Sequence, residues 1–300
     1  MVSTKKQYTS RKEFYKQYNR TSNAAELRAR FLKNRVAVIG TVVFLLIVIV
    51  AICAPIIADY ETEAIKIDVA NRLQPPNGEH ILGTDELGRD ILARIVHGAR
   101  ISLIIGISSV GIALLIGGTL GAISGFFGGW IDNGIMRIMD VFLCLPEMLL
   151  ALAIVAAFGN SQRNMVLSIG IAFAPKMSRI VRAAALSVRS NEYVEAARSI
   201  GARNGRIIVS HVLINCLSPI IVQFTLYVAN AILTISALSF IGLGIEAPTP
   251  EWGNMLASGR AYMRDSPYIV MAPGFAIFFT ILSLNLMGDG LQDTLDPRLK

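Results

Sequence analysis

The chain has 300 residues, of which 53% are hydrophobic and 16% charged, and its mean hydropathy is +0.55. This composition excludes a soluble domain, and uncharged runs of about 20 residues predict several membrane-spanning helices. The net charge of +7 does not indicate nucleic acid, because a six-span topology with both termini inside places 20 of the 28 Lys and Arg in the cytoplasm. We therefore expect a multi-pass protein of the bacterial inner (plasma) membrane, in contact with the lipid bilayer.

The first 97 residues predict a tail, a span and an outer segment. Residues 1–35 carry ten Lys and Arg and are too long and too charged for the start of a signal peptide, so they predict a cytoplasmic tail. Residues 36–57 contain no charge over 22 positions and predict the first transmembrane helix. Residues 58–97 then form an extracytoplasmic segment, in which Asp85 of the stretch GTDELGRD is expected to cap a helix.

Spans 2 and 4 are expected to pack inside a helix bundle. Glycines at four-residue spacing lie within span 2, residues 101–123, or just after it: Gly117, Gly121, Gly125 and Gly129. This spacing lets two helices approach closely. Span 4 starts near Met165 and loses its apolar character after Pro175. We expect its helix to continue into the cytoplasm.

Span 3, residues 133–158, is unusually polar. Arg137 and Asp140 lie one turn apart, and we interpret them as a local ion pair near the cytoplasmic interface. Glu147 stands beside Pro146, and two interpretations stay open for it. It is either a residue of a translocation pathway, as intramembrane acids usually are, or a hydrogen-bonding residue at a proline kink.

Spans 5 and 6 complete the predicted fold. Span 5, from Leu217 to Gly244, carries Gln223 and Asn230 among several polar residues, so we expect it to line a cavity. Span 6 covers residues 268–288, and residues 291–300 form a cytoplasmic C-terminal tail. The fold class is therefore an all-α, polytopic integral membrane protein with six transmembrane helices.

A polar and basic element, residues 190–205, separates spans 4 and 5. Its apolar residues share one shallow face of a helix of about three turns: Tyr193, Ala196, Ala197 and Ile200. Ser190 or Asn191 can cap the start of this helix. Glu195 suits its first turn, and Gly201 can end it in the left-handed conformation. We interpret it as a docking helix for a partner, because a helix lying on the membrane would favour bulkier residues than two alanines.

The sequence contains no motif of catalysis or metal binding. It lacks GxxxxGK[ST], a nucleophile elbow and HExxH, and its three cysteines and three histidines are scattered without a CxxC pair. We therefore expect no enzyme activity, no cofactor and no metal site in this polypeptide. Any ATP-driven step must belong to a separate subunit.

The pattern EAA, three residues, then glycine at Glu195–Gly201 resembles the coupling loop of permease subunits of ATP-binding-cassette (ABC) importers. Further similar stretches begin GTDELGRD, ALSFIGLG and NLMGDGLQ. Across nearly its whole length the chain is similar to the C-type permease subunit of oligopeptide, dipeptide and nickel ABC importers. One departure is at 211–214, where the broader family pattern has Ile-x-Leu-Pro and this chain has HVLI.

The resemblance implies a type I importer permease fold, with an ABC transmembrane domain at residues 98–290 and a coupling helix at 190–205. It also implies a homologous permease as partner, two ATPase subunits that hold ATP and Mg, and an extracytoplasmic substrate-binding protein. The implied substrates are peptides, with nickel or metal chelates as the alternative. An ion-gradient-driven transporter is a further alternative, but only Glu147 provides the midplane acid that such a protein needs.

Overall fold

The computed structural model describes residues 23–295. Its helices are α2 (Asn23–Lys33), α3 (Arg35–Ile52), α4 (Ala54–Ile57), α5 (Ile91–Ala113), α6 (Thr119–Phe127), α7 (Gly129–Leu143), α8 (Glu147–Phe158), α9 (Gln162–Arg189), α10 (Glu192–Ser199), α11 (Asn204–Ile207), α12 (Leu217–Leu238), α13 (Trp252–Gly259) and α14 (Tyr268–Leu295). Short π-helical or 3-10 turns extend or connect several of them, including Leu114–Gly118 and Ser239–Leu243. Within the described range extended backbone pairs only in one isolated bridge, Thr84 with Asp90, so the all-α prediction is confirmed.

Four helical segments are long and apolar enough to cross a membrane: Arg35–Ile52, Ile91–Phe127, Leu217–Leu243 and Tyr268–Leu295. Helices α7 and α8 together make a fifth candidate, but they are bent by 83° where the sequence predicted one continuous span. The break ends at Pro146, which cannot donate to a helical hydrogen bond. Helix α9 has 28 residues, but it carries charged residues such as Lys176 and Arg179. It is therefore not among the helices that are apolar enough to cross a membrane. The polytopic fold is confirmed, and α9 as a sixth span stays a prediction.

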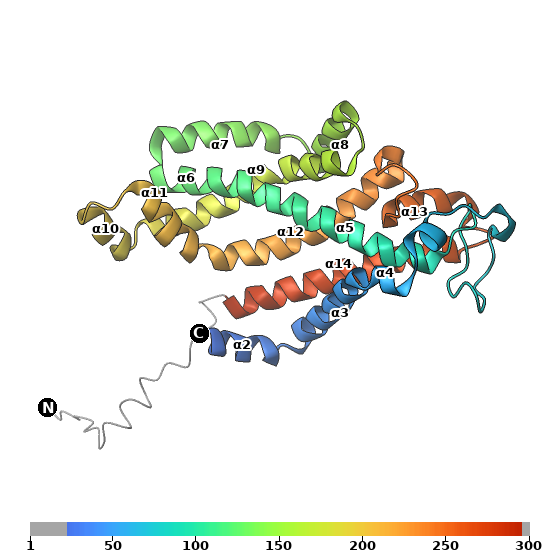
Figure 1. Cartoon of the computed structure of the whole chain (residues 1–300). Helices are drawn as coiled ribbons and strands as arrows, with labels where there is room; N and C mark the ends of the chain where they lie inside the picture. The colour runs from blue at the N-terminus through green and yellow to red at the C-terminus, as the bar shows by residue number, and fades with distance from the viewer. Residues whose placement is uncertain (1–22, 296–300) are drawn as a thin grey trace, which may run out of the picture.

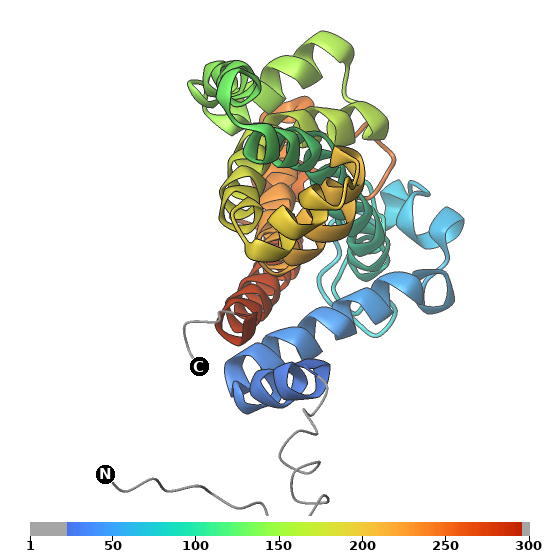
Figure 2. The ribbon, with the colours of Figure 1, turned by 90° about the vertical axis from the view of Figure 1, so that its left-hand side faces the viewer.

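The short helices gather at the two ends of the bundle (Figure 1). Helices α10 and α11 lie at one end with α2 and the C-terminal end of α14, whereas α13 and the segment 59–90 lie at the other. Figure 2 looks onto the first of these ends, where α10 and α11 stand in front of the bundle. Helix α2 packs against α3 and α14. The helix before the first span and the docking element therefore share one end, as the predicted topology requires.

Glycines allow the long α5–α6 segment to meet α9 backbone to backbone. A Cβ on each of three glycines would collide with a main-chain oxygen of α9: Gly117 with Ala174, Gly121 with Ser178 and Gly125 with Arg182. Gly129, the fourth glycine of the series, has open space around it and a φ of +55°, because it forms the turn into α7. The predicted close packing is confirmed for the first three glycines.

The outer segment, residues 59–90, folds onto the start of α5 through a buried charge cluster. The carboxylate of Asp85 accepts a hydrogen bond from Nε of Arg89 at 2.7 Å and lies 3.3 Å from Nε of Arg94. All three side chains are buried. A carboxylate shared by two guanidinium groups offsets the desolvation of each charge, so the segment is a folded cap rather than a linker.

Helix α5 begins at Ile91, inside the outer segment 58–97 that the sequence predicted. Its N-cap is Asp90, whose side chain accepts the N–H of Ala93 at 2.8 Å. The expectation that Asp85 caps this helix is therefore wrong. Asp85 pairs instead with Arg89 and Arg94, and Asp90, five residues later, caps the helix.

Candidate functional site

The polar element between α9 and α12 contains α10, an eight-residue helix that ends in a Schellman motif. Gly201 has a φ of +80°. Its N–H donates to the carbonyl oxygen of Arg198 at 2.9 Å, and the N–H of Ala202 donates to that of Ala197 at 3.1 Å. These bonds satisfy carbonyl groups that the end of a helix leaves unpaired. The left-handed glycine is confirmed, and the helix is shorter than the three turns expected.

Helix α10 has one buried side and one exposed side. Val194 and Ala197 are buried, and the guanidinium of Arg198 lies over the ring of Phe126 in α6, 4.8 Å from its centroid. The exposed side carries four of the predicted coupling residues, Tyr193, Glu195, Ala196 and Ile200, with Ile200 85% exposed. The expectation that Ala197 belongs to the docking face is wrong, because that position is turned into its own bundle and anchors α10 there.

The start of α10 lacks the side-chain cap that the sequence predicted at Ser190 or Asn191. Asn191 occupies the N-cap position, but its side chain accepts no N–H of the helix and donates instead to the hydroxyl of Tyr193 at 3.1 Å. Glu192 and Glu195 lie in the first turn as expected. Their charge there is favoured by the positive end of the helix dipole.

Three ion pairs join α7 and α8 to α9, and we call them the ion-pair ladder. The N–O distances are 2.5 Å for Arg182–Asp132, 2.6 Å for Arg179–Asp140 and 2.7 Å for Lys176–Glu147. The bases recur every three residues, so they share one side of α9. The predicted local pair of Arg137 with Asp140 is wrong, because Asp140 reaches across to the neighbouring helix. The sequence signal for the ladder was a set of basic residues that recur every three positions in a helix of membrane length.

Glu147 begins α8 directly after the bend at Pro146. Its partner Lys176, which the sequence did not single out, follows Pro175 near the middle of α9. Both side chains keep part of their surface free, 30% for Glu147 and 47% for Lys176. Charges halfway along a membrane-length helix rarely face lipid. The pair therefore marks a surface of the bundle that is turned away from the bilayer.

Gln223 and Asn230 lie on one face of α12, because they are seven residues apart. Gln223 lines a groove of about 630 Å³ between α9, α12 and α14, together with Ser187 and Gln292. Asn230 is exposed and lies outside this groove, and Glu147 is not part of its lining either. The structure thus places two of the predicted pathway residues on α12 and Glu147 on α8, and it does not gather the three into one pocket.

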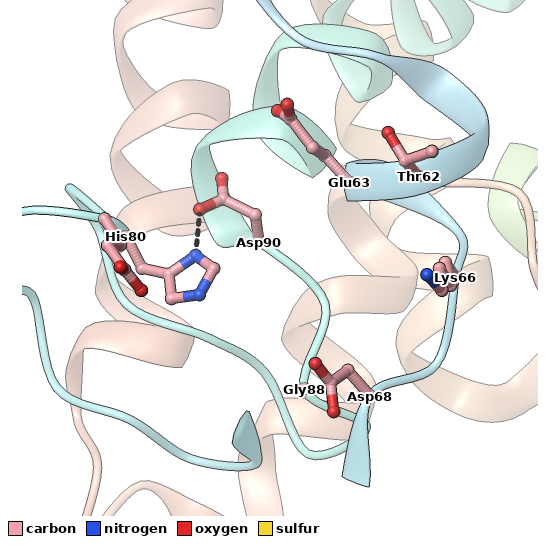
Figure 3. Close-up of a pocket in the computed structure, with 8 residues that line it drawn as sticks. Thr62, Glu63, Lys66, Asp68, His80, Gly88 and Asp90 are labelled. Carbon is pink, nitrogen blue, oxygen red and sulfur yellow. Dashed lines mark hydrogen bonds and ion pairs between the residues drawn. The ribbon is translucent and has the colours of Figure 1, made fainter. Parts of the chain in front are cut away.

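A smaller hollow lies in the outer segment (Figure 3), which stands at the end of the molecule opposite α10 (Figure 1). It has a volume of about 260 Å³ and its lining is mostly charged or polar: Thr62, Glu63, Lys66, Asp68, Glu79, His80 and Asp90. Nδ1 of His80 lies 2.8 Å from Oδ2 of Asp90. No residue predicted to be functional lines this hollow. Across residues 23–295, no three His, Cys, Asp or Glu side chains are placed to hold a metal ion.

The structure combines four helical segments of membrane length with a short helix, α10, that stands between α9 and α12 and is exposed on one side. The chain belongs to the family described as binding-protein-dependent transport system inner membrane component, whose model matches residues 117–300. The N-terminal transmembrane domain of oligopeptide transport permease C matches residues 22–76. The protein is therefore a permease subunit of an ABC importer, in which ATP hydrolysis takes place on separate subunits, and the ion-gradient alternative is set aside.

Named relatives cover most of the chain. It is 45% identical to the dipeptide transport system permease protein DppC of Alkalihalophilus pseudofirmus, over 95% of this chain and 93% of the relative. It is 46% identical to the di/tripeptide transport system permease protein DppC of Pseudomonas aeruginosa, over 90% of each. It is 42% identical to the glutathione transport system permease protein GsiD of Pectobacterium atrosepticum, over 92% and 91%.

A solved structure supports the fold. The MetNI methionine ABC transporter, in an inward-facing conformation, is 15% identical to this chain and superposes with a TM-score of 0.56. The match covers 69% of this chain and 98% of that chain. The type I permease fold expected from the sequence is thereby confirmed.

Proposed function

We propose that this chain forms half of the translocation pathway of a peptide importer and receives motion from cytosolic ATPase subunits through α10. The observation that carries the proposal is the exposed side of α10 on a helix that is fixed to the bundle. Val194 and Ala197 hold it from the inside, and the Schellman motif at Gly201 fixes its end. The small side chain of Ala196 lets the groove of a partner approach the backbone closely. Because α10 is fixed to the bundle, a movement of the partner against its exposed side would be passed on to the membrane-spanning helices.

Peptides are the substrate class that the relatives favour. Their printed names refer to dipeptides, tripeptides and glutathione, which is itself a tripeptide. The alternative of nickel or metal chelates has no comparable support among these names. A binding protein outside the membrane would deliver the peptide, and a homologous permease would provide the other half of the pathway.

The end of the bundle that carries α10 is assigned to the cytoplasm. The same end holds α2 and the C-terminal end of α14 (Figure 1), and the distribution of Lys and Arg favours this orientation. Both termini are then cytoplasmic, the segment 58–97 faces the outside, and the two ATPase subunits with their ATP and Mg dock on the coupling helices.

The pathway is assigned to the side of α9 that carries Lys176. Ala183 and Ser187 follow Lys176 by seven and eleven residues, so they lie on the same side of the helix. Both line the groove that also contains Gln223. Glu147, paired with Lys176, extends this polar surface towards the middle of the membrane. Asn230 continues it along α12, so all three predicted pathway residues belong to one inner surface.

The test uses the complete transporter in proteoliposomes, supplied with its binding protein and a labelled dipeptide, glutathione or Ni²⁺. Ala196→Asp places a charge in the docking side, so we expect it to abolish peptide uptake and substrate-stimulated ATP hydrolysis. Ala196→Ser, a small polar change at the same position, is expected to keep both. Copurification of the second permease controls for misfolding. Full stimulated hydrolysis by Ala196→Asp would contradict the coupling role, and uptake of Ni²⁺ but not of peptides would contradict the substrate class.

A further inference from the structure

The end of the bundle opposite α10 contains a groove that none of the roles above explains. One part, of about 530 Å³, lies between α3 and α5, and a second part, of about 720 Å³, lies between α5 and the start of α9. Ile104 and Ser108 line both parts, so they form one continuous surface depression. We call it the outer groove. Its walls are mostly apolar, with Ile52 and Leu103 on one side and Leu167 on the other.

Two arginines line this groove, Arg100 of α5 in the part beside α3 and Arg163 of α9 in the part beside the start of α9. Both are exposed, and neither forms a hydrogen bond or ion pair with the part of the chain from 23 to 295. The other charged side chains of α9 that face the bundle have partners, as Lys176 shows. Two unpaired guanidinium groups beside an apolar surface are complementary to a ligand with an anionic head and an apolar tail.

The position of the arginines matches the level of lipid headgroups. Arg163 is the second residue of α9, and the groove also contains Ile52 and Pro55, where the first span ends. Ile104 and Ser108 lie one and two turns further along α5 than Arg100, in the direction of the membrane interior. The charges therefore stand at the mouth of the groove and the apolar walls run inward from them.

The outer groove is separate from the proposed pathway. Leu167 in the groove and Lys176 on the pathway side are nine residues apart, which is about two and a half helical turns, so they lie on opposite sides of α9. The end of α3 and the start of α9, which bound the groove, also lie at the opposite end of the bundle from α10 (Figure 1). An occupant of the groove would thus touch neither the substrate nor the ATPase subunits.

We propose that the outer groove binds one anionic phospholipid, with its phosphate between Arg100 and Arg163 and an acyl chain along Ile104 and Leu167. Guanidinium groups bind phosphate oxygens through paired, charge-assisted hydrogen bonds. The acyl chain covers apolar side chains of three helices, so the lipid joins α3 and α9 to α5. This inference rests on the membrane fold and not on the role of α10 or on the nature of the substrate.

The experiment measures lipid retained by the complete transporter after reconstitution in nanodiscs of phosphatidylglycerol and phosphatidylcholine with identical acyl chains. Native mass spectrometry of the released complex counts the bound lipid. We expect phosphatidylglycerol to be retained in preference to phosphatidylcholine, and Arg100→Gln with Arg163→Gln to lower its retention at least about tenfold, the effect of losing one charged hydrogen bond or more. Arg100→Lys with Arg163→Lys keeps the charge and is expected to retain part of the preference.

The matched control removes two other unpaired positive charges on the outer side, Lys66→Gln with Arg264→Gln, and is expected to leave retention unchanged. Soluble glycerol phosphate is expected not to displace the lipid, because it cannot occupy the apolar walls. Three results would overturn the proposal: equal retention of the two lipids, unchanged retention in the Arg100 and Arg163 double variant, or displacement by glycerol phosphate. Loss of the second permease from that double variant would instead identify the groove as a protein interface and would also overturn it.

Discussion

The α-carbon of Gly117 lies so close to the carbonyl oxygen of Ala174 that a side chain at this glycine would overlap with the backbone of α9. The same relationship repeats one turn later at Gly121 and Ser178. Two long helices are therefore in direct main-chain contact along the halves that lie nearer to α10. Because α9 leads into α10 after only two residues, the α5–α6 segment is expected to move with the coupling helix as one body.

We expect Gly121→Ala to lower the free energy of unfolding by about 1–3 kcal/mol, since its Cβ would meet the carbonyl oxygen of Ser178. Thermal unfolding of the complex in detergent measures the change. Gly111→Ala, on the same long helix, is the matched control, because a Cβ there has no neighbour within 4 Å. Its Tm should be unchanged or slightly higher, as alanine favours helix. Identical Tm values for the two variants would show that α6 and α9 can move apart at Gly121 without loss of stability.

The pair of Glu147 with Lys176 is expected to be sensitive to the loss of either charge. Glu147→Gln and Lys176→Gln each leave one charge without its partner, and we expect each to slow peptide uptake by about tenfold. The double variant removes both charges and should recover part of the rate. Uptake assays in proteoliposomes decide the question. If Glu147→Gln transports every tested peptide like the unmodified protein, the glutamate has only a structural role at the kink.

Glu251 is expected to control the stability of the outer end. It is fully buried and its carboxylate accepts the N–H groups of Gly253 and Asn254 at 2.8 and 2.9 Å, which makes it the N-cap of α13. Glu251→Ala should cost about 1–2 kcal/mol. Glu251→Gln keeps one accepting oxygen and should cost less. Equal melting temperatures for both variants and the unmodified protein would contradict the cap.

The same residue predicts a pH dependence. Burial raises the pKa of Glu251 above its ordinary value of 4.5. The folded state then holds a proton more tightly than the unfolded state, so this group lowers stability as the pH rises above about 4.5 through the raised pKa. Relative to Glu251→Gln, the Tm of the unmodified protein should rise as the pH is lowered towards 4.5. A constant difference in Tm as the pH is lowered to this value would show that the carboxyl does not titrate above it.

Gly201 provides a sharper test of the coupling element than any alanine. Its φ of +80° disfavours every residue with a Cβ, and a β-branched residue most of all. We expect Gly201→Val to weaken binding of the ATPase subunits and to reduce substrate-stimulated hydrolysis several-fold while membrane insertion persists. Gly205→Val is the control, because Gly205 has no such φ and no neighbour within 4 Å of a Cβ. Equal hydrolysis by the two variants would exclude Gly201 from the transmission of motion.

The proposed orientation can be tested with a matched pair of exposed asparagines. In a background without Cys53, Cys144 and Cys216, a cysteine at Asn77 should react with an impermeant thiol reagent in intact cells. A cysteine at Asn204, beside α10, should react only after the membrane is permeabilised. Labelling of Asn204→Cys in intact cells would reverse the topology.

Local features of this fold could be predicted from the sequence because they depend on neighbours along the chain. The apolar spans, the left-handed Gly201 and the four-residue glycine spacing are of this kind. The predictions that failed concern a choice between partners. Asp140 could pair with Arg137 one turn away or with Arg179 on another helix, and only the packing of α7 on α9 decides between them.

The coupling helix shows the same limit. Four apolar residues at helical spacing define a face, but the sequence does not say which part of that face is covered by the chain's own bundle. The anchoring role of Ala197 depends on the path of α9, which delivers α10 with Val194 and Ala197 inward. Part of the N-terminal tail, residues 1–22, and residues 296–300 of the C-terminal tail lie outside the described residues, so the predictions for them stay predictions.

The ion-pair ladder has a consequence for how such a protein keeps a membrane sealed. Helix α7 has only one buried side chain, Met139, so charge rather than apolar contact holds it to α9. Pulling the two helices apart in a dry environment would expose three pairs of opposite charges at a cost of several kcal/mol per ion, whereas water would solvate them. Water that reaches the seam between α7 and α9 would therefore lower the free-energy cost of separating the two helices.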